Sequence, residues 1–217
     1  MACNVVCISH ETGAGGEEVG RLVAERLGFL YVDEEIVVRA AQKSGIDPGT
    51  VASQETRQSL VKRTLEAMAA GGSELPALAG GMPLPGAKES SSERIREFIR
   101  DTVVQTADRG DVVIVAHAAS FAVDLRDQNL RVLVAGKPTN RAARLVAEQG
   151  LGDSEAARAV KTADAGRRDY LKRFYDVEQE LPIHYDLVVN TDRLGIDGAA
   201  QVITDAAAVA HGSRTQA

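Results

Sequence analysis

The residues best suited to chemistry stand near the N-terminus, in a glycine-rich segment between two apolar ones. Residues 4–9 form a predicted apolar strand, and residues 17–27 carry the apolar spacing of an amphipathic helix. A strand, a glycine-rich loop and a helix in this order bring backbone N–H groups together around a phosphate. We therefore predict a phosphate-binding site made of Thr12, Gly13, Ala14, Gly15, Gly16, Glu17 and Glu18.

The same loop lacks the positive charge that usually accompanies it. In the signature G-x-x-x-x-G-K-[ST], a lysine and a hydroxyl residue follow the last glycine. Here Gly16 holds the lysine position, and we assign the hydroxyl position to Glu18. A phosphate oxygen about 4 Å from a carboxylate is repelled by about 4 kcal/mol at an effective dielectric constant near 20. The helix dipole stabilises a first-turn acid by only about 0.3–1 kcal/mol, so an inward carboxylate needs a cation.

Two interpretations of the acids in the first helical turn stay open. In the first, Glu18 binds Mg²⁺ and so reverses the sign of the local charge, while Glu17 faces solvent. In the second, both are ordinary acids at a helix N-terminus, and no phosphate lies nearby.

Bulk composition excludes several classes of protein. The chain has 217 residues and a formal net charge of -6, with a pI near 5.3, which argues against non-specific binding to nucleic acid or anionic membranes. No apolar run approaches the length of a membrane span, and no signal peptide is visible, so we expect a cytoplasmic protein. Cys3 and Cys7 lie about 13 Å apart on an extended strand, too far to form a disulfide with each other.

Short apolar runs alternate with helical periodicity along the chain. The predicted strands lie at 4–9, 29–32, 111–116, 130–135 and 187–190, and their nearly continuous apolar character is typical of a parallel sheet covered on both faces. Predicted helices lie between them, and an alanine-rich one spans 195–210. We therefore predict an α/β fold with a doubly wound, five-stranded parallel sheet.

Residues 1–217 are predicted to form a single domain with two insertions. The first, 34–110, contains helices and a Gly/Pro/Ser-rich stretch at 71–92 that we expect to be mobile. The second, 148–182, carries a charged helix. Residues 211–217 are predicted to be a flexible tail. Both insertions begin near the carboxyl edge of the sheet, where ligands bind in open α/β folds.

Polar residues stand at the predicted carboxyl ends of three strands. They are Ser9 and His10 after the first, Asp33 after the second and His117 after the third. If they converge on the glycine loop, Asp33 is a magnesium or substrate ligand and the histidines donate hydrogen bonds to phosphate. Alternatively, these side chains cap helices and satisfy backbone groups.

The second insertion supplies compensating positive charge. Asp164, Arg167, Tyr170 and Arg173 recur every third residue, which places neighbours on one broad helical face. Arginine forks match phosphoryl oxygens, so such a helix is suited to close over a nucleotide. The alternative is a solvated face, with Asp164 paired to Arg168 at i,i+4. Three arginines outside this helix are further candidates for the same cleft: Arg39, Arg141 and Arg144.

Over almost its whole length the chain resembles nucleoside monophosphate kinases, and more closely the cytidylate kinase-like family. The resemblance is carried by Ile8-Ser9 before the glycine loop, Leu27-Gly28 before Tyr31-Val32-Asp33, the segment from Asp164 to Tyr175, and Tyr185 through Asp192. It implies a P-loop kinase fold with a helical nucleoside monophosphate-binding insertion and a lid.

The resemblance also implies an activity, ATP-dependent phosphoryl transfer with Mg²⁺ to a nucleoside monophosphate, with CMP or dCMP expected as the acceptor. The glycine loop would hold ATP, and Asp33 or Glu18 would bind the metal. The residues expected to carry the transfer are Arg167, Arg173, Arg144 and Asp164, and those expected to bind the acceptor are Asp33, Arg39, His117 and Arg141.

Several departures from the family pattern remove positive charge from this cleft. Glu17 stands where the family commonly has arginine, Ala116-His117-Ala118 replaces Gly-Arg, and Ala163 and Gly166 stand where cytidylate kinases tend to carry lid arginines. The rival hypothesis is therefore a catalytically impaired module that binds nucleotide or regulates. A kinase acting on another small molecule is a third.

Overall fold

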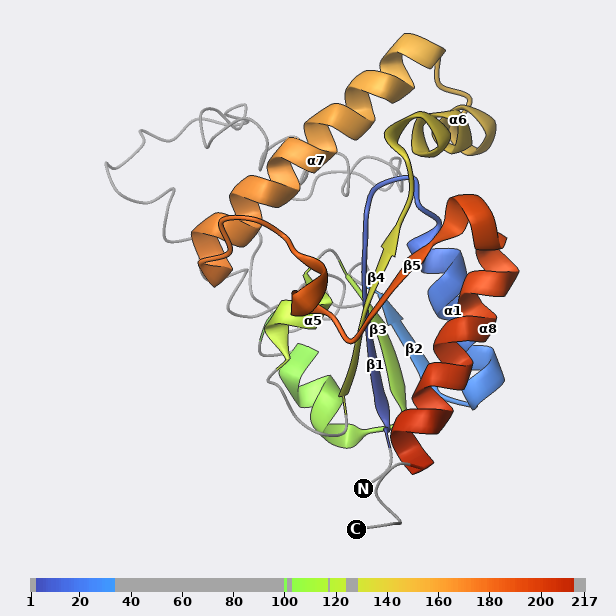
Figure 1. The fold of residues 1–217 in the computed structure, drawn as a ribbon, viewed down its shortest axis with the longest axis vertical. Helices are drawn as coiled ribbons and strands as arrows, with labels where there is room; N and C mark the ends of the chain where they lie inside the picture. Colours follow the sequence, from blue (N-terminus) through green and yellow to red (C-terminus); the bar gives the residue numbers. More distant parts are fainter. Residues whose placement is uncertain (1–2, 34–99, 101–102, 117, 124–128, 213–217) are drawn as a thin grey trace, which may run out of the picture.

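Five parallel strands form the centre of the molecule. The computed structural model describes residues 3–33, 100, 103–116, 118–123 and 129–212. The sheet has the order β2-β3-β1-β4-β5 (Figure 1), so β1, which leads into the glycine loop, is the central strand. This confirms the predicted five-stranded parallel sheet. The strands are β1 (Val5–His10), β2 (Leu30–Asp33), β3 (Val112–Val115), β4 (Asn129–Ala135) and β5 (Leu187–Asn190).

Helices cover both faces of the sheet, which explains the uninterrupted apolar runs. Helices α1 (Gly16–Leu27) and α8 (Thr191–Gly212) lie on one face, and α5 (Ala119–Ala122) and a helix at 103–109 lie on the other (Figure 1). Along β1, Val6 and Ile8 belong to the core beneath α1 and α8, whereas Val5 and Cys7 belong to the opposite core. Successive residues of a strand point to opposite faces, so both sets must be apolar.

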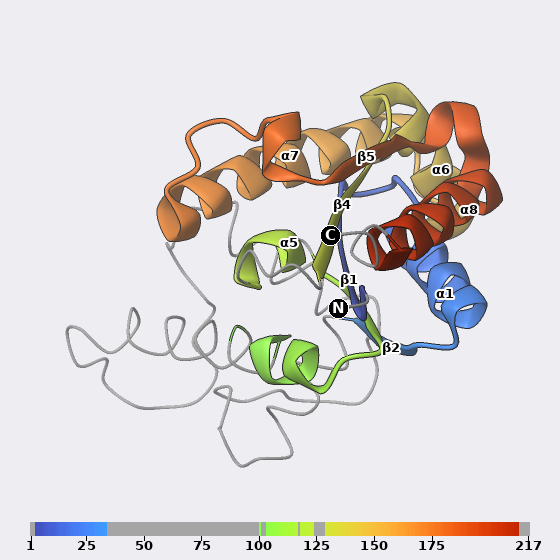
Figure 2. The same ribbon diagram turned by 60° about the horizontal axis from the view of Figure 1, so that its bottom comes forward.

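Two further helices lie beyond the carboxyl edge of the sheet. Helix α6 (Pro138–Gln149) follows β4, and α7 (Asp153–Tyr175) runs across the end of the sheet toward the side of α5 (Figure 2). An apolar cluster joins the two, with Ala142 and Leu145 of α6 against Ala156 and Val160 of α7. The segment returns to the sheet through a short 3-10 helix, η1 (Pro182–His184). The charged helix predicted within 148–182 is therefore α7.

Most predicted boundaries differ from the observed ones by one residue, but α8 begins four residues earlier than predicted. Its first turn precedes Gly195, where the backbone leaves helical geometry at φ 65 and ψ -178. Apolar periodicity does not reveal such a turn because Thr191 and Asp192 serve the site rather than the core. Helix α8 also continues to Gly212, so the first two residues of the predicted tail are helical.

Several predictions lie outside the described residues. These are the mobile stretch at 71–92, nearly all of the first insertion, Arg39, His117 and residues 213–217. Within the described ranges, no helix is long and apolar enough to cross a membrane. Cys3 and Cys7 are both buried free thiols, as expected from their separation.

Candidate functional site

The glycine loop has the backbone shape of an anion-binding nest. Gly13 and Gly15 have positive φ values of 79 and 76 degrees, and they alternate with Ala14 and Gly16. Left-handed residues that alternate with right-handed ones turn successive N–H groups toward a common point, where an anion can be held. The positive end of the α1 dipole adds to this attraction, because α1 begins at Gly16.

Three consecutive carbonyl groups of the loop are held by side chains from other elements. Arg141 Nη1 donates to Thr12 O at 3.1 Å, and Arg144 Nη1 donates to Gly13 O at 2.6 Å. The hydroxyl of buried Thr191 donates to Ala14 O at 3.0 Å. These bonds tie the loop to α6 and to the first turn of α8. The loop is thus braced in its bent form by protein groups alone.

The position of the missing lysine is sterically blocked by a neighbouring side chain. A Cβ at Gly16 would collide with Cβ and Cγ of His10, the last residue of β1. His10 therefore occupies the space into which a side chain at position 16 would start. The packing of His10 against the loop is therefore compatible with glycine at position 16 and not with lysine.

Glu17 and Glu18 both lie exposed on the first turn of α1. Glu17 pairs with Arg21, one turn further along α1, at 3.8 Å. The signature places its hydroxyl residue directly after the lysine, at Glu17, so assigning that position to Glu18 was wrong by one residue. The pKa of Glu148 on α6 is raised, first by burial and then by the charge of Glu18, which places these two acids near each other.

Asp33 ends β2 at the same edge of the sheet and lies 3.6 Å from the guanidinium of Arg21. Within the described residues, no group of three or more His, Cys, Asp or Glu side chains is placed to hold a metal ion. Magnesium at a nucleotide site usually needs only one or two carboxylates besides phosphates and water. Exposed Glu18 fits that limited requirement better than Asp33, whose charge is shared with Arg21.

Arg141 is the most buried charged residue of the site, with only 1% of its surface exposed. Its Nη1 and Nη2 donate to the two carboxylate oxygens of Asp164 on α7 at 2.9 and 2.8 Å. Its Nε donates to Gly136 O at 2.9 Å. Burial lowers the pKa of this guanidinium, but the hydrogen bonds to Asp164 and the charges of the nearby acids together outweigh burial and raise it. Arg141 therefore braces loop, α6 and α7 together, and its predicted contact with substrate stays a prediction.

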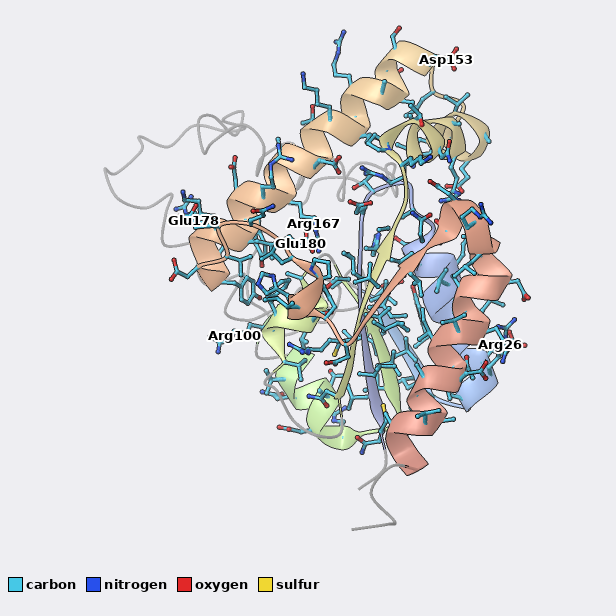
Figure 3. All side chains as sticks on the ribbon, in the orientation of Figure 1. Arg26, Arg100, Asp153, Arg167, Glu178 and Glu180 are labelled. Carbon is cyan, nitrogen blue, oxygen red and sulfur yellow. The ribbon has the colours of Figure 1, made fainter. Side chains whose placement is uncertain are left out.

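Arg167 is also buried, and its guanidinium is hydrogen-bonded to a carboxylate and to a phenol hydroxyl. Its Nε and Nη2 donate to Glu180 Oε2 and Oε1 at 2.8 and 2.5 Å, and Nη2 also lies 3.1 Å from Tyr185 Oη. Burial raises the pKa of Glu180, but the hydrogen bonds and charge of Arg167 outweigh burial, and the pKa is lowered. Figure 3 shows Arg167 and Glu180 side by side beneath α7.

The other two lid residues predicted to take part in transfer, Arg173 and Asp164, differ in their surroundings. Arg173 is exposed, with its guanidinium 5.3 Å from the ring centre of Phe174. Asp164 pairs with Arg141 rather than serving a solvated face with Arg168. The structure thus brings Asp164, Arg141, Arg144 and Arg167 around the loop, and it places Arg173 apart.

Sequence reasoning missed four residues of this site. Glu11 accepts a hydrogen bond from Gly136 N at 3.0 Å, and its pKa is raised by burial. Thr191, Glu180 and Tyr185 are likewise not predicted as site residues from the sequence. Tyr185 and Thr191 lie in the segment that carried the family resemblance, so that segment was a usable signal, whereas nothing in the residue pattern marks Glu180.

The comparisons with known proteins agree with this geometry. A model of the cytidylate kinase-like family matches residues 5–193. The chain belongs to this family. A cytidylate kinase of Chloroflexus aggregans is 29% identical over 160 residues, which cover 66% of this chain and 69% of that protein. A second, from Afipia carboxidovorans, is 26% identical over 172 residues, which cover 76% and 78%. Family membership supports a nucleotide kinase.

Solved structures share the fold at low sequence identity. An uncharacterized protein from Eubacterium ventriosum has a TM-score of 0.66 at 14% identity, over 94% of this chain and 98% of that one. Shikimate kinase from Bacteroides thetaiotaomicron has a TM-score of 0.50 at 15% identity, over 93% and 97%. With the observed strand order, these likenesses confirm the doubly wound fold of P-loop kinase type.

Replacing Asp164 with alanine removes the carboxylate that pairs with buried Arg141. We expect D164A to lower the free energy of unfolding by about 2–3 kcal/mol, less than the loss for a fully buried pair because Asp164 is partly exposed. Urea denaturation at neutral pH measures the change. D169A, an exposed acid on the same helix, is the matched control and should change stability by less than about 0.5 kcal/mol. Equal losses in the two variants would contradict the brace.

Restoring the signature lysine should not improve the site. G16K must displace His10, and we expect the exposed acids of the first turn of α1 to pair with the new ammonium group in competition with phosphate. We expect G16K and G16A both to bind ATP with Mg²⁺ more weakly than the unmodified protein, by isothermal titration calorimetry. A tenfold or larger gain in affinity for G16K would show that neither the packing nor the acids matter.

Proposed function

We propose that this chain is a cytidylate kinase-like phosphotransferase that moves a phosphoryl group from ATP to a nucleoside monophosphate, with CMP or dCMP as the preferred acceptor. The observation that carries the proposal is the braced nest at the end of β1. Its carbonyls at Thr12, Gly13 and Ala14 are all bound by protein donors. A loop held open in this way offers its amides to phosphates at no reorganisation cost when the nucleotide binds.

The choice of acceptor follows the relatives. Two proteins named cytidylate kinase match most of the chain, and the family model spans the loop, α7 and β5. Arg144, which is bonded to the loop at Gly13 O, and Arg167, at the end of β1, are the cations we assign to stabilising charge on a transferring group. The first insertion, 34–110, which includes Arg39, would carry the monophosphate-binding part that the family resemblance implies.

The described residues would offer a magnesium ion one or two carboxylates. When bound with the nucleotide, the ion would neutralise negative charge during transfer. Glu18 is the carboxylate we assign to it, because it lies exposed next to the loop and its charge is not shared with an arginine in the described contacts. Asp33 is the second predicted ligand, and it would have to release Arg21 to serve.

A catalytically impaired nucleotide-binding or regulatory module of the same fold is the second candidate. Two observations favour it. The loop has no lysine and is closed to one by His10, and Arg167 is engaged with Glu180 instead of standing open. Such a module would bind nucleotide without turning it over.

An assay of ADP release separates these functions. The purified protein is incubated with ATP and Mg²⁺ and with CMP, dCMP, UMP, AMP or shikimate in turn, and ADP is measured by a coupled reaction. Release that depends on CMP or dCMP supports the proposal. ADP release that depends on another acceptor would indicate a kinase with a different substrate. Binding of ATP by calorimetry without any release favours the module, and no binding of ATP, CMP or CDP at millimolar concentration contradicts both.

Arg167 and its neighbour on α7, Arg168, provide a matched pair of variants for testing the role of Arg167. R167A should reduce the rate by about 100-fold or more, because it removes a cation next to the loop. R168A removes an exposed arginine from the next position and should leave the rate within about twofold. Thermal unfolding of both variants shows whether loss of rate reflects loss of fold, and R167K serves where R167A is unstable. Equal rates for R167A and R168A would contradict the role of Arg167.

A further inference from the structure

We infer that Glu180 and Tyr185 are positioning residues that hold the guanidinium of Arg167 at the end of β1. This role rests on the proposed function, and it adds two side chains that lie outside the loop and outside the charged helix. Glu180 follows α7 by five residues, and Tyr185 directly precedes the segment leading into β5. Neither is expected to touch the nucleotide, because each acts through the arginine.

The three side chains form a closed triangle of hydrogen bonds. Glu180 receives the Nε and Nη2 edge of Arg167 side-on through both of its oxygens. Tyr185 accepts a bond from Nη2 at 3.1 Å and donates its own proton to Glu180 Oε1. A guanidinium gripped along one edge cannot rotate without breaking at least two of these bonds. The plane and direction of the fork are therefore set by residues outside the helix that carries it.

The remaining nitrogen of the fork lies at the end of β1, the strand that leads into the glycine loop. Arg167 Nη1 lies 3.5 Å from the carbonyl oxygen of His10, the residue that ends β1. The side chain of His10 in turn fills the space beside Gly16. Held by its opposite edge, the guanidinium thus presents Nη1 to the start of the loop. An arginine that must meet a phosphoryl group at one point gains rate from being held in advance.

Burial separates this pair from ordinary surface ion pairs. The side chains of Arg167 and Glu180 are 8% and 18% exposed, whereas those of the neighbouring pair Lys172 and Glu178 are 60% and 74% exposed. Exposed ion pairs such as Lys172 and Glu178 do little to fix the orientation of their side chains. Glu178 lies on the same connecting segment and carries the same charge, but pairs with Lys172 instead of Arg167, so it is a matched control for Glu180. Figure 3 shows Glu178 apart from Arg167 and Glu180.

The test compares E180Q, Y185F and E178Q in the ADP-release assay. E180Q should lower kcat by about 10–100-fold, with KM for ATP changed by less than about threefold. Y185F should lower kcat by a smaller factor, and E178Q should stay within about twofold of the unmodified protein. In the R167K background, E180Q should cause no further loss of kcat, because the side-on grip is already gone. A higher kcat or tighter ATP binding in E180Q would mean that Glu180 competes with phosphate for Arg167, and would overturn the positioning role.

A second readout does not depend on turnover. The Nε–H signal of Arg167 in a ¹H–¹⁵N spectrum, assigned by its loss in R167K, should be protected from exchange in the unmodified protein and in E178Q. It should move and lose protection in E180Q. This pattern in a protein that transfers no phosphoryl group would contradict the proposed function while supporting the held guanidinium. An unchanged signal in E180Q would overturn the positioning role whatever the activity.

Discussion

The arrangement of the site depends on the bracing of one loop. Arg141, Arg144 and Thr191 bind three consecutive carbonyl groups between β1 and α1, and they come from α6 and from the first turn of α8. Because a peptide group carries its N–H opposite its C=O, fixing the carbonyls outward directs the amides to the other side. The shape that can hold a phosphate is therefore a property of tertiary packing, and the glycines permit it by their positive φ values.

Positive charge in this site is used chiefly inside the protein. Arg141 pairs with Asp164, Arg167 with Glu180 and Arg21 with Asp33. Each pair joins separate segments of the chain: the first joins α6 to α7, and the second joins α7 to the segment that leads into β5. The helix that the residue spacing suggests as a closing flap is thus held to α6 at Asp164 and to the following segment at Arg167. Electrostatic help for a bound nucleotide would come from backbone amides and from arginines that are already positioned.

The fold could be predicted from local patterns because each strand is short, apolar and buried on both faces. Val5 to Ile8 show this directly, since alternate residues enter two different cores. The site could be predicted only in part. Glycine spacing identifies the loop, but it does not show that Arg141 is buried in a brace or that His10 fills the space beside Gly16. Those facts depend on how the chain packs in three dimensions, as in the hydrogen bond from Arg141 to Thr12 O, 129 positions away. Glu180 could not be found because a lone acid in a connecting segment has no distinguishing pattern.

The central claim is that the loop amides, held open by the brace, bind phosphate. Glycine-selective ¹⁵N labelling, with the signals of the loop assigned by substitution, allows a direct titration with a non-hydrolysable ATP analogue and Mg²⁺. We expect the amide signals of Gly13, Gly15 and Gly16 to shift most and to saturate together. Saturable binding that leaves these three signals in place, or no shift at millimolar analogue, would contradict it.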